Sequence, residues 1–336
     1  MRSCLLIACI IMLASCQKGR KPLLNESIGQ PYEVLVVGDD SIATDIVRQQ
    51  LLTPVEGLPQ QEPSFDVSVT DQRHFNATLR STRNIVVVRI GTSASGRTSI
   101  RKMSNTPASP QIEVVIDAPS VNQLQADMAG MGALLRQLLD DNETAAAQAL
   151  LERSHNTEAE QTVREMFGID MRIPADMTSS KRGTDFLWLS NNSPDAMQNI
   201  CLYIYKKGIN PTAIDWRTMR DSVMKENIPG EADGMYMRTA KTQLALNTTD
   251  SSTVCRGLWE MEGDMMGGPF VSIAFADPTR QRIVVAEAFV YAPGKPKRNL
   301  MKQVEAALRT IRQTTEHTEK KQQKRYEQSN SRGYHV

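Results

Sequence analysis

The sequence is short of the residue types on which several functions depend. Aromatic residues make up 5% of the 336 residues, which leaves few side chains for platforms that stack bases or sugars. The 39 Lys and Arg nearly balance the 38 Asp and Glu, whereas proteins that bind nucleic acids carry a basic excess that displaces counterions. The composition therefore indicates no nucleic-acid partner.

Motifs for metals, nucleotides and activated nucleophiles are also missing. The four histidines, at positions 74, 155, 317 and 335, form no HxH, HxxxH or HExxH pair, so the common zinc geometries have no local support. The sequence contains neither a Walker A motif nor a GxGxxG run after a strand. Residues 91–96 come near the GxSxG nucleophile elbow, but Ser95 stands where the motif needs Gly. We expect no metal and no cofactor.

The start of the chain, MRSCLLIACIIMLASC, has the anatomy of a signal peptide. Arg2 precedes an apolar run over residues 5–13, which is too short to span a bilayer, since a spanning helix needs about 20 residues. The run ends in LASC, which resembles the lipobox of bacterial lipoproteins, in which the Cys becomes the lipidated first residue of the mature protein. We expect a lipoprotein signal peptide over residues 1–15 and a single membrane anchor at Cys16. The alternative is a plain signal peptide.

The polar residues after Cys16 are typical of a tether. Residues 16–30 carry mostly polar side chains, and the part that follows Cys16 reaches at most about 45 Å when fully extended. Some lipoproteins of the Bacteroidota carry an acidic surface-export signal directly after this Cys, and none is present here. That difference favours a protein that faces the periplasm.

The first half of the mature chain alternates strand and helix patterns. Apolar, β-rich runs predict buried strands, and amphipathic spacing after capping residues predicts helices. We expect strands over residues 32–38, 65–69, 83–90 and 111–118, helices over 42–51 and from 121 to about 167, and a loop over 91–110. Residues 31–167 are therefore predicted to form an N-terminal α/β domain, which ends where Gly168 stops the long helix.

The second half has shorter strands separated by turns, which predicts antiparallel pairing. Expected strands lie at residues 171–174, 185–189, 200–205, 257–261, 269–276 and 282–291, and expected helices near 216–228 and 300–311. We predict a C-terminal antiparallel α+β domain over residues 168–313 and a polar, disordered tail over 314–336. The predicted fold class is α+β, with mixed and antiparallel sheets flanked by helices.

Six runs of the mature chain carry a family resemblance. They are GLPQQEP, RNIVVV, PQIEVVIDAPS, IPGEADGMYM, RGLWEMEGDMMGGPFVS and FVYAPGKPKR. These runs resemble a family of Bacteroidota lipoproteins of unknown function, over nearly the whole mature chain. The resemblance implies no activity and no catalytic residues. The order of strands and helices in the second half is similar to that of PsbP-like α/β/α sandwiches, a likeness that concerns the fold alone.

Two cysteines remain in the mature domains. Cys201 and Cys255 would face an oxidising compartment, which favours a disulfide. Both lie in apolar, strand-like runs, however, where Cys serves well as a small buried side chain. The sequence leaves both alternatives open.

Three carboxylates stand where chemistry is conceivable. Asp39 and Asp40 follow a buried strand, where open α/β sheets place ligands, but capping of the next helix explains them more simply. Glu287 interrupts an apolar strand, so its charge must be paired or reach solvent. We expect an Arg partner for Glu287 in preference to a role as a general acid.

The best candidate for a functional surface is the run GDMMGGP over residues 263–269. Glycine-rich segments are costly to order, and two adjacent methionines supply adaptable apolar contacts. We expect this loop to contact a partner or ligand through Trp259, Asp264, Met265, Met266, Gly267 and Gly268. The simpler alternative is a wide turn between two strands, with both methionines packed inward.

The scarcity of catalytic motifs favours binding or envelope assembly over catalysis, with an envelope protein as the expected partner. The alternative function is an envelope hydrolase that works through carboxylates. Such an enzyme would need a deep pocket lined by Glu287, Asp264 or Glu260.

The LASC run yields a direct test of the anchor. Metabolic labelling of cells with a fatty-acid analogue is expected to mark the wild-type protein and not the Cys16→Ala variant, because the acyl chains attach through this residue. Equal labelling of the two proteins would show that the anchor lies elsewhere.

Overall fold

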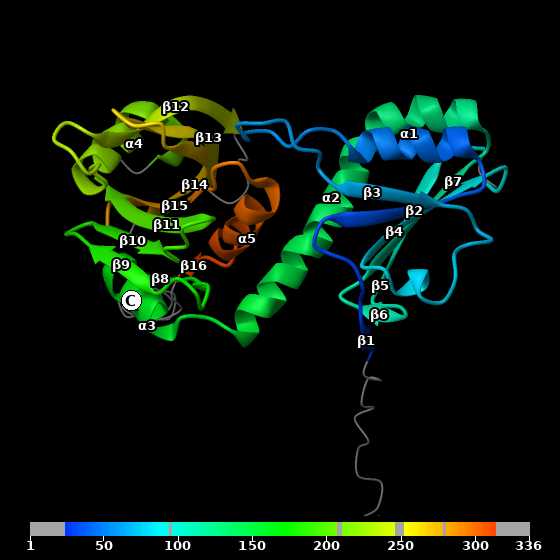
Figure 1. Ribbon diagram of the computed structural model, residues 1–336, viewed down its shortest axis with the longest axis horizontal. Helices are drawn as coiled ribbons and strands as arrows, with labels where there is room; N and C mark the ends of the chain where they lie inside the picture. The colour runs from blue at the N-terminus through cyan, green and yellow to red at the C-terminus, as the bar shows by residue number, and fades with distance from the viewer. Residues whose placement is uncertain (1–23, 94–95, 207–209, 246–251, 278–279, 314–336) are drawn as a thin grey trace, which may run out of the picture.

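Two sheets, each packed against its own helices, organise the chain (Figure 1). The computed structural model describes residues 24–93, 96–206, 210–245, 252–277 and 280–313. The expected signal peptide, Cys16 and the polar tail over 314–336 lie outside the described residues. No helix within the described ranges combines the length and the hydropathy of a membrane span.

The first sheet is mixed, with the strand order β3-β2-β4-β7-β5. The parallel strands are β2 (Glu33–Val37), β3 (Asp66–Thr70), β4 (Asn84–Ile90) and β7 (Ile112–Ala118), and β5 (Ser99–Ser104) is the antiparallel edge. Helices α1 (Ser41–Leu51) and α2 (Val121–Arg153) cover one face. Phe75 and Leu79, beside the short 3-10 helix η2 (Leu79–Ser81), cover the other. The strands read as continuous apolar runs because both faces are buried.

Two segments expected to lack regular structure contain strands. The expected loop over 91–110 holds β5 and the short β6 (Ala108–Ser109), and β1 (Asn25–Glu26), inside the expected tether, pairs with β6. The loop expectation was wrong because an edge strand needs little apolar surface. Residues 101–104 are exposed, and the edge carries Arg101 and Lys102, charges that protect it from further pairing.

Every pair of neighbours in the second sheet is antiparallel. The strand order is β12 (Tyr236–Ala245), β13 (Ser252–Glu262), β14 (Gly267–Asp277), β15 (Arg282–Tyr291), β11 (Met197–Tyr205), β10 (Phe186–Ser190) and β9 (Ser179–Arg182). Helices α3 (Thr157–Phe167) and α5 (Arg298–Leu308) cover one face, and α4 (Trp216–Asn227), preceded by the short η3 (Pro211–Ala213), covers the other. The two sheets with their flanking helices confirm the α+β fold class.

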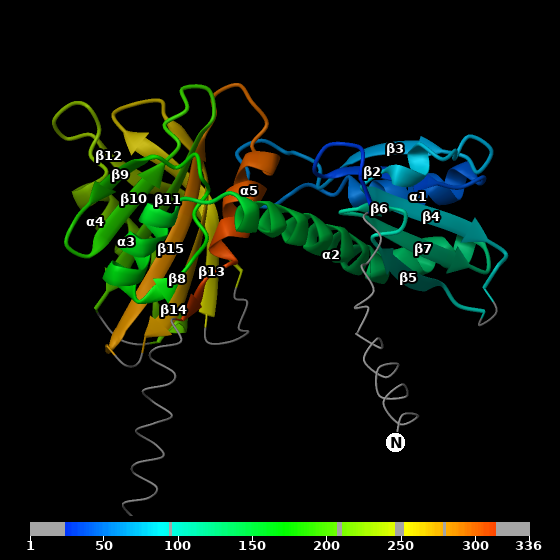
Figure 2. The same ribbon diagram turned by 90° about the horizontal axis from the view of Figure 1, so that it is seen from below.

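The segment that joins the two sheets contains two helices where one was expected. Helix α2 ends at Arg153, and Asn156 starts α3 by accepting a hydrogen bond from Ala159 N at 3.0 Å. The apolar side of α3, including Val163 and Phe167, belongs to the core of the second domain. The long helix expected to continue to residue 167 is therefore two helices, and the polar stretch between them separates the domains (Figure 2). The strand expected over 171–174 is replaced by β8 (Ile169–Asp170), which pairs with β16 (Arg312–Gln313).

A fully buried ion pair lies between α4 and the second sheet. Arg220 is 1% exposed and Glu287 is 0% exposed, and Arg220 Nη2 donates to Glu287 Oε1 at 2.8 Å. Ser272 Oγ donates to Glu287 Oε2 at 2.5 Å, and Tyr203 donates to the same oxygen at 3.3 Å. Arg220 Nη1 donates to Thr239 Oγ1 at 3.1 Å. Glu287 thus has the expected Arg partner.

The two cysteines lie in one row of the same sheet, on either side of Glu287. The register aligns Cys255 with Ser272, Ser272 with Glu287, and Glu287 with Cys201. Three strand spacings separate the two thiols, or roughly 14 Å, whereas a disulfide needs α-carbons within about 7 Å. Both are free and buried, and burial raises the pKa of Cys255 to about 12. The structure therefore selects separate buried thiols.

Replacing one partner of the buried pair is expected to cost far more than replacing both. Arg220→Met leaves the Glu287 charge buried without its partner, so the free energy of unfolding should fall by about 3–5 kcal/mol. The double variant Arg220→Met/Glu287→Met should recover part of that loss. Urea unfolding followed by circular dichroism measures the free energy of unfolding of these two variants and of Glu287→Met. A loss in the double variant equal to the sum of the losses in Arg220→Met and Glu287→Met would contradict the coupling.

Candidate functional site

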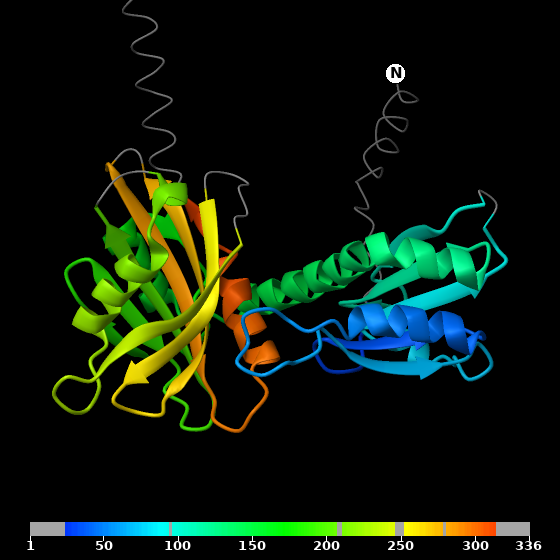
Figure 3. The same cartoon turned by 90° about the horizontal axis from the view of Figure 1, so that it is seen from above.

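Residues 53–64 of the first domain form an arm that reaches the second domain beside α5 (Figures 1 and 3). The base of the arm is closed by a hydrogen bond from Val55 N to Glu62 O at 2.9 Å. Near its tip, Leu58 packs against the apolar cluster between α5 and the second sheet. The arm brings first-domain residues onto the face of the second sheet that α5 covers.

Glu62 of the arm caps helix α5. Its carboxylate accepts hydrogen bonds from Lys297 N at 2.7 Å and Arg298 N at 2.8 Å. Lys297, the residue at the N-cap position, provides no side-chain cap of its own. A carboxylate at this position satisfies orphan N–H groups and favours the positive end of the helix dipole, which together stabilise a helix by about 1 kcal/mol. The first domain therefore completes a helix of the second.

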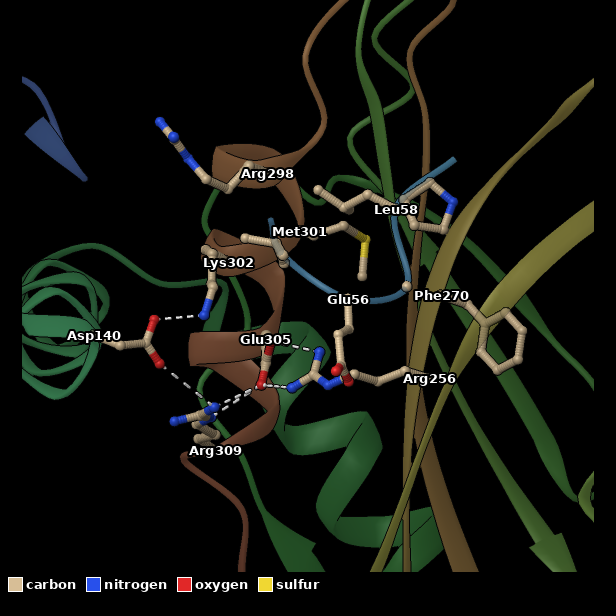
Figure 4. Close-up of a pocket in the computed structure, with 13 residues that line it drawn as sticks. Glu56, Leu58, Asp140, Arg256, Phe270, Arg298, Met301, Lys302, Glu305 and Arg309 are labelled. Carbon is tan, nitrogen blue, oxygen red and sulfur yellow. Dashed lines mark hydrogen bonds and ion pairs between the residues drawn. The ribbon is translucent and has the colours of Figure 1, made fainter. Parts of the chain in front are cut away.

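The arm, α2 and α5 enclose a pocket of about 220 Å³ between the domains (Figure 4). Its charged lining consists of four basic side chains and three carboxylates: Arg256, Arg298, Lys302, Arg309, Glu56, Asp140 and Glu305. Figure 4 shows Arg256 and Arg309 converging on Glu305, while Asp140 faces α5 from α2. Apolar groups, including Leu58 and Met301, complete the wall.

Glu305 is the electrostatic centre of this pocket. It is 4% exposed and accepts hydrogen bonds from Arg256 Nη1 at 3.0 Å and Arg309 Nη2 at 2.7 Å. Arg256 Nη1 donates to Glu305 Oε2, whereas Arg256 Nη2 and Arg309 Nη2 both donate to Glu305 Oε1. Burial alone raises the pKa of Glu305, but Arg256, Arg309 and Lys302 outweigh burial and lower the pKa to about 2. The carboxylate is therefore ionised across the physiological range.

Asp140 connects α2 of the first domain to α5. It forms ion pairs with Lys302 and, at 4.0 Å, with Arg309 Nη2. The Tyr32 hydroxyl donates to Asp140 Oδ1 at 3.3 Å, and burial together with the Asp140 charge raises the pKa of Tyr32. Arg298 pairs with Asp66 of the first domain. Because each basic group has a carboxylate partner, the arrangement holds the domains together.

Sequence reasoning missed this pocket because its charges come from segments far apart in the chain. Glu305 lies in α5, Arg256 in β13 and Asp140 in α2. The one local signal was the spacing of Glu305 and Arg309, which are four residues apart on one helix and form an ion pair. A glutamate on the apolar side of an amphipathic helix indicates a buried charge, but it does not name the partner.

The β13–β14 hairpin forms a second hollow, which contains the predicted site residues. All six residues from Trp259 to Gly268 that the sequence singled out line one shallow depression of about 380 Å³. Pro59 of the arm, Ala240, Leu258 and Glu260 complete its lining. We call this hollow the hairpin depression.

The glycines of the hairpin serve the strands more than the loop. Gly267 and Gly268 lie within β14, so the connecting turn comprises only residues 263–266, and the seven-residue loop expected from the sequence was too long. A β-carbon on Gly268 would lie 2.0 Å from Val290 O, and one on Gly267 would lie 2.9 Å from Trp259 O. Only Gly keeps these strands at their spacing.

The two methionines of the turn have different environments. Met265 is fully exposed, at 101%, whereas Met266 packs against the apolar core under α4. Trp259 is 2% exposed and meets Phe289 edge-on at 5.5 Å, so it is not an open platform. Its indole Nε1 is buried without a hydrogen-bond partner among the described residues. One methionine is thus packed inward and the other is presented outward.

Of the three carboxylates named for the alternative hydrolase, Glu260 and Asp264 share the shallow hairpin depression, and Glu287 lies apart from them. Glu287 is buried with Arg220, while Glu260 and Asp264 lie at the hairpin depression, where Glu260 pairs with Arg238. Asp40 caps α1 through Ile42 N and Ala43 N, at 3.0 and 2.9 Å, and Asp39 accepts from Gln72 N at 3.0 Å. The described residues contain no group of three His, Cys, Asp or Glu side chains placed to hold a metal ion.

Comparisons with known proteins match each structural domain separately. Residues 27–152 match a domain of unknown function (DUF8532), and residues 156–310 match another domain of unknown function (DUF4837). The gap between the two matches coincides with the polar stretch between α2 and α3. No curated protein matches the chain. Among solved structures, a mutant of the protein Mog1 is 10% identical, covers 44% of this chain and 90% of its own, and has a TM-score of 0.29, which does not establish a common fold.

The lowered pKa of Glu305 predicts a pH dependence of stability. A carboxyl group whose pKa falls from its ordinary 4.5 to about 2 on folding stabilises the fold above pH 4.5, and this contribution is lost as the pH falls toward 2. Glu305→Gln should therefore be less stable than wild type at neutral pH, with a gap that narrows between pH 4.5 and 2. Urea unfolding at several pH values measures the gap.

Glu260→Gln is the matched control, because it makes the same substitution in an exposed ion pair. Glu260 pairs with Arg238, and the side chain of Glu260 is 41% exposed. Exposed pairs contribute about 0–1 kcal/mol, so this variant should stay close to wild type throughout. A gap for Glu305→Gln that is constant with pH would show that the carboxylate charge is not what stabilises the fold.

Proposed function

We propose that the protein is a lipid-anchored envelope protein of the Bacteroidota that faces the periplasm and binds an envelope protein through the hairpin depression. The anchor is proposed from the lipobox-like LASC run, and the periplasmic orientation from the absence of an acidic signal after Cys16. The family resemblance of the mature chain supports the same assignment. The two matched families are domains of unknown function, so neither match contradicts this assignment.

The fully exposed Met265 carries the binding proposal. Its turn is ordered by local bonds, because Met261 N donates to Met266 O at 2.9 Å and Asp264 Oδ1 accepts from Met265 N at 2.5 Å. A polar residue would serve this turn equally well, since the side chain of Met265 contributes nothing to the core. An ordered, exposed methionine beside a hollow is suited to adaptable apolar contact with a partner.

The charges at the rim of the depression indicate what the partner offers. Asp264 is exposed at the tip of the hairpin, and the Glu260 and Glu262 carboxylates share the single cation Arg238. The rim is therefore acidic. A partner that carries an apolar side chain flanked by basic residues complements this surface.

The two methionines allow the binding role to be separated from stability. Met265→Ser should leave the thermal midpoint nearly unchanged, whereas Met266→Ser should lower stability, since Met266 is partly buried and removing a fully buried Met side chain costs about 2–5 kcal/mol. Thermal unfolding of the purified full chain measures both. Equal destabilisation by the two substitutions would place Met265 in the core.

A photoreactive residue at position 264 tests binding in intact cells. It should give a discrete adduct that the Met265→Ser substitution reduces several-fold. The same photoreactive residue at position 150, where Leu150 is 61% exposed on α2, should give no such adduct. An adduct of equal yield with and without Met265, or from both positions, would rule out the hairpin depression as the binding surface.

A further inference from the structure

The interdomain pocket and the hairpin depression lie on one face of the β13–β14 ladder, with the arm between them. Arg256 lines the pocket and Leu258 lines the depression, and two residues of a strand span only about 7 Å. Leu58 of the arm lines the first hollow, and the next residue, Pro59, lines the second. The tip of the arm therefore forms the wall that divides one longer groove into two.

The tip of the arm is held by few contacts. Residues 56–61 form no hydrogen bond with any residue that the structure describes. The hydrogen bonds that fix the arm lie at its base, where Glu62 caps α5 and Pro63 O accepts from Arg298 Nη1 at 2.8 Å. Beyond this base, the tip depends on the packing of the half-buried Leu58. The tip can therefore leave the sheet while Glu62 keeps the domains joined.

We infer that the face of β13–β14 beneath the arm is a docking surface for an extended apolar segment of a partner protein, and that the tip of the arm is its internal competitor. This inference rests on the proposed function, because the segment continues from the hairpin depression that the partner contacts. Displacing the tip joins the two hollows along the ladder, from Arg256 in the pocket to Leu258 in the depression.

The chemistry of the partner segment can be read from the arm that now occupies the surface. Leu58 supplies an apolar side chain, and Pro59 holds the residue before it in an extended conformation. Glu56 adds a carboxylate to the pocket that Arg256 also lines. An extended segment with an acidic residue two positions before an apolar residue and a proline meets these conditions, and the basic residues that complement the acidic rim of the hairpin depression follow the proline.

A segment tethered in the same chain competes at an effective concentration of about millimolar. A partner segment therefore binds the wild-type protein weakly until the tip is displaced. Weakening the tip should increase the affinity for such a segment, and fastening it should abolish binding.

A labelled peptide with the sequence of residues 55–62 serves as the probe, with binding to the full chain carrying Cys16→Ser measured by fluorescence polarisation. The Leu58→Ser variant of this chain, in which the tip of the arm is weakened, should bind the peptide at least about tenfold more tightly than the same chain with Leu58. A peptide with Ser in place of its Leu is the matched control and should not bind. Equal affinity for both proteins, or for both peptides, would overturn the inference.

A disulfide across the arm provides the opposite test. A β-carbon on Gly57 would lie 3.4 Å from the β-carbon of Arg256, close to the separation of about 3.5–4.5 Å in disulfides. Gly57 has a φ of +80°, which a cysteine adopts with strain, so the tip of the reduced Gly57→Cys/Arg256→Cys variant is weakened and should leave the surface open to the peptide. Oxidation of the same protein should abolish peptide binding, and Arg256→Cys alone, which cannot form the bridge, is the control for the loss of the arginine. Binding that is unchanged by reduction would overturn the inference.

The adduct from position 264 connects this surface to the cellular partner. Its yield should rise with Leu58→Ser and fall in the oxidised disulfide variant. Absence of the adduct in every variant, with peptide binding that still follows the state of the arm, would remove the proposed function and the cellular role of the arm. An adduct that is indifferent to the arm, with no peptide binding, would remove this inference and leave the proposed function intact.

Discussion

The first turn of any helix carries N–H groups without acceptors in the helix, and α5 receives its acceptor from the other domain. Glu62 reaches across to Lys297 N and Arg298 N, which fixes the position of the helix relative to the first domain. The side chains of α5 that face α2 and the arm follow from this position. The interdomain pocket, the ion pairs of Asp140 and the location of the arm all depend on it.

Buried glutamates paired with arginines recur at each level of the structure. Glu143 of α2 is 2% exposed and meets Arg83 at 2.8 Å, Glu287 meets Arg220 inside the second domain, and Glu305 meets Arg256 at the interface. Desolvation offsets much of the attraction within an isolated buried pair, which therefore adds little net stability, whereas at Glu305 three cations outweigh the effect of burial. Such a pair also contributes to the specificity of the fold. A shifted strand or helix would leave a charge buried without its partner, so each pair disfavours that shifted arrangement.

The parts of the fold that could be predicted are those that the local sequence determines. Continuous apolar runs placed the central strands β2, β4, β7 and β15, and capping and periodicity placed α1 and α4. Strands β5, β9 and β12 were missed, since polar or mixed sequences at sheet edges show no apolar period. The Arg partner of Glu287 was predicted as a residue type, but Arg220 itself was not, because the pairing of distant segments leaves no mark on either one.

The same distinction applies to the site. Glycines, methionines and a tryptophan close together in sequence identified the residues of the hairpin depression, although Gly267 and Gly268 turned out to be strand residues that allow close approach. The arm was not predicted from the sequence, because its Gly and Pro residues indicate its local conformation and not the surface that it reaches. The surface that Leu58 packs against belongs to the second domain, so the sequence of the arm alone does not identify it.

The pairing of β8 with β16 brings together the two ends of the second domain. Ile169 aligns with Gln313 and Asp170 with Arg312, and Asn156 N, where α3 begins, donates to Ile173 O at 2.8 Å. Both ends of the described part of this domain therefore lie at one corner. A domain whose ends meet in this way can be carried as an insertion within another chain, or joined to a different neighbour, without disturbing its own sheet. The second domain therefore has the geometry of an exchangeable module, and its partnership with the first domain rests on surface contacts instead of shared strands.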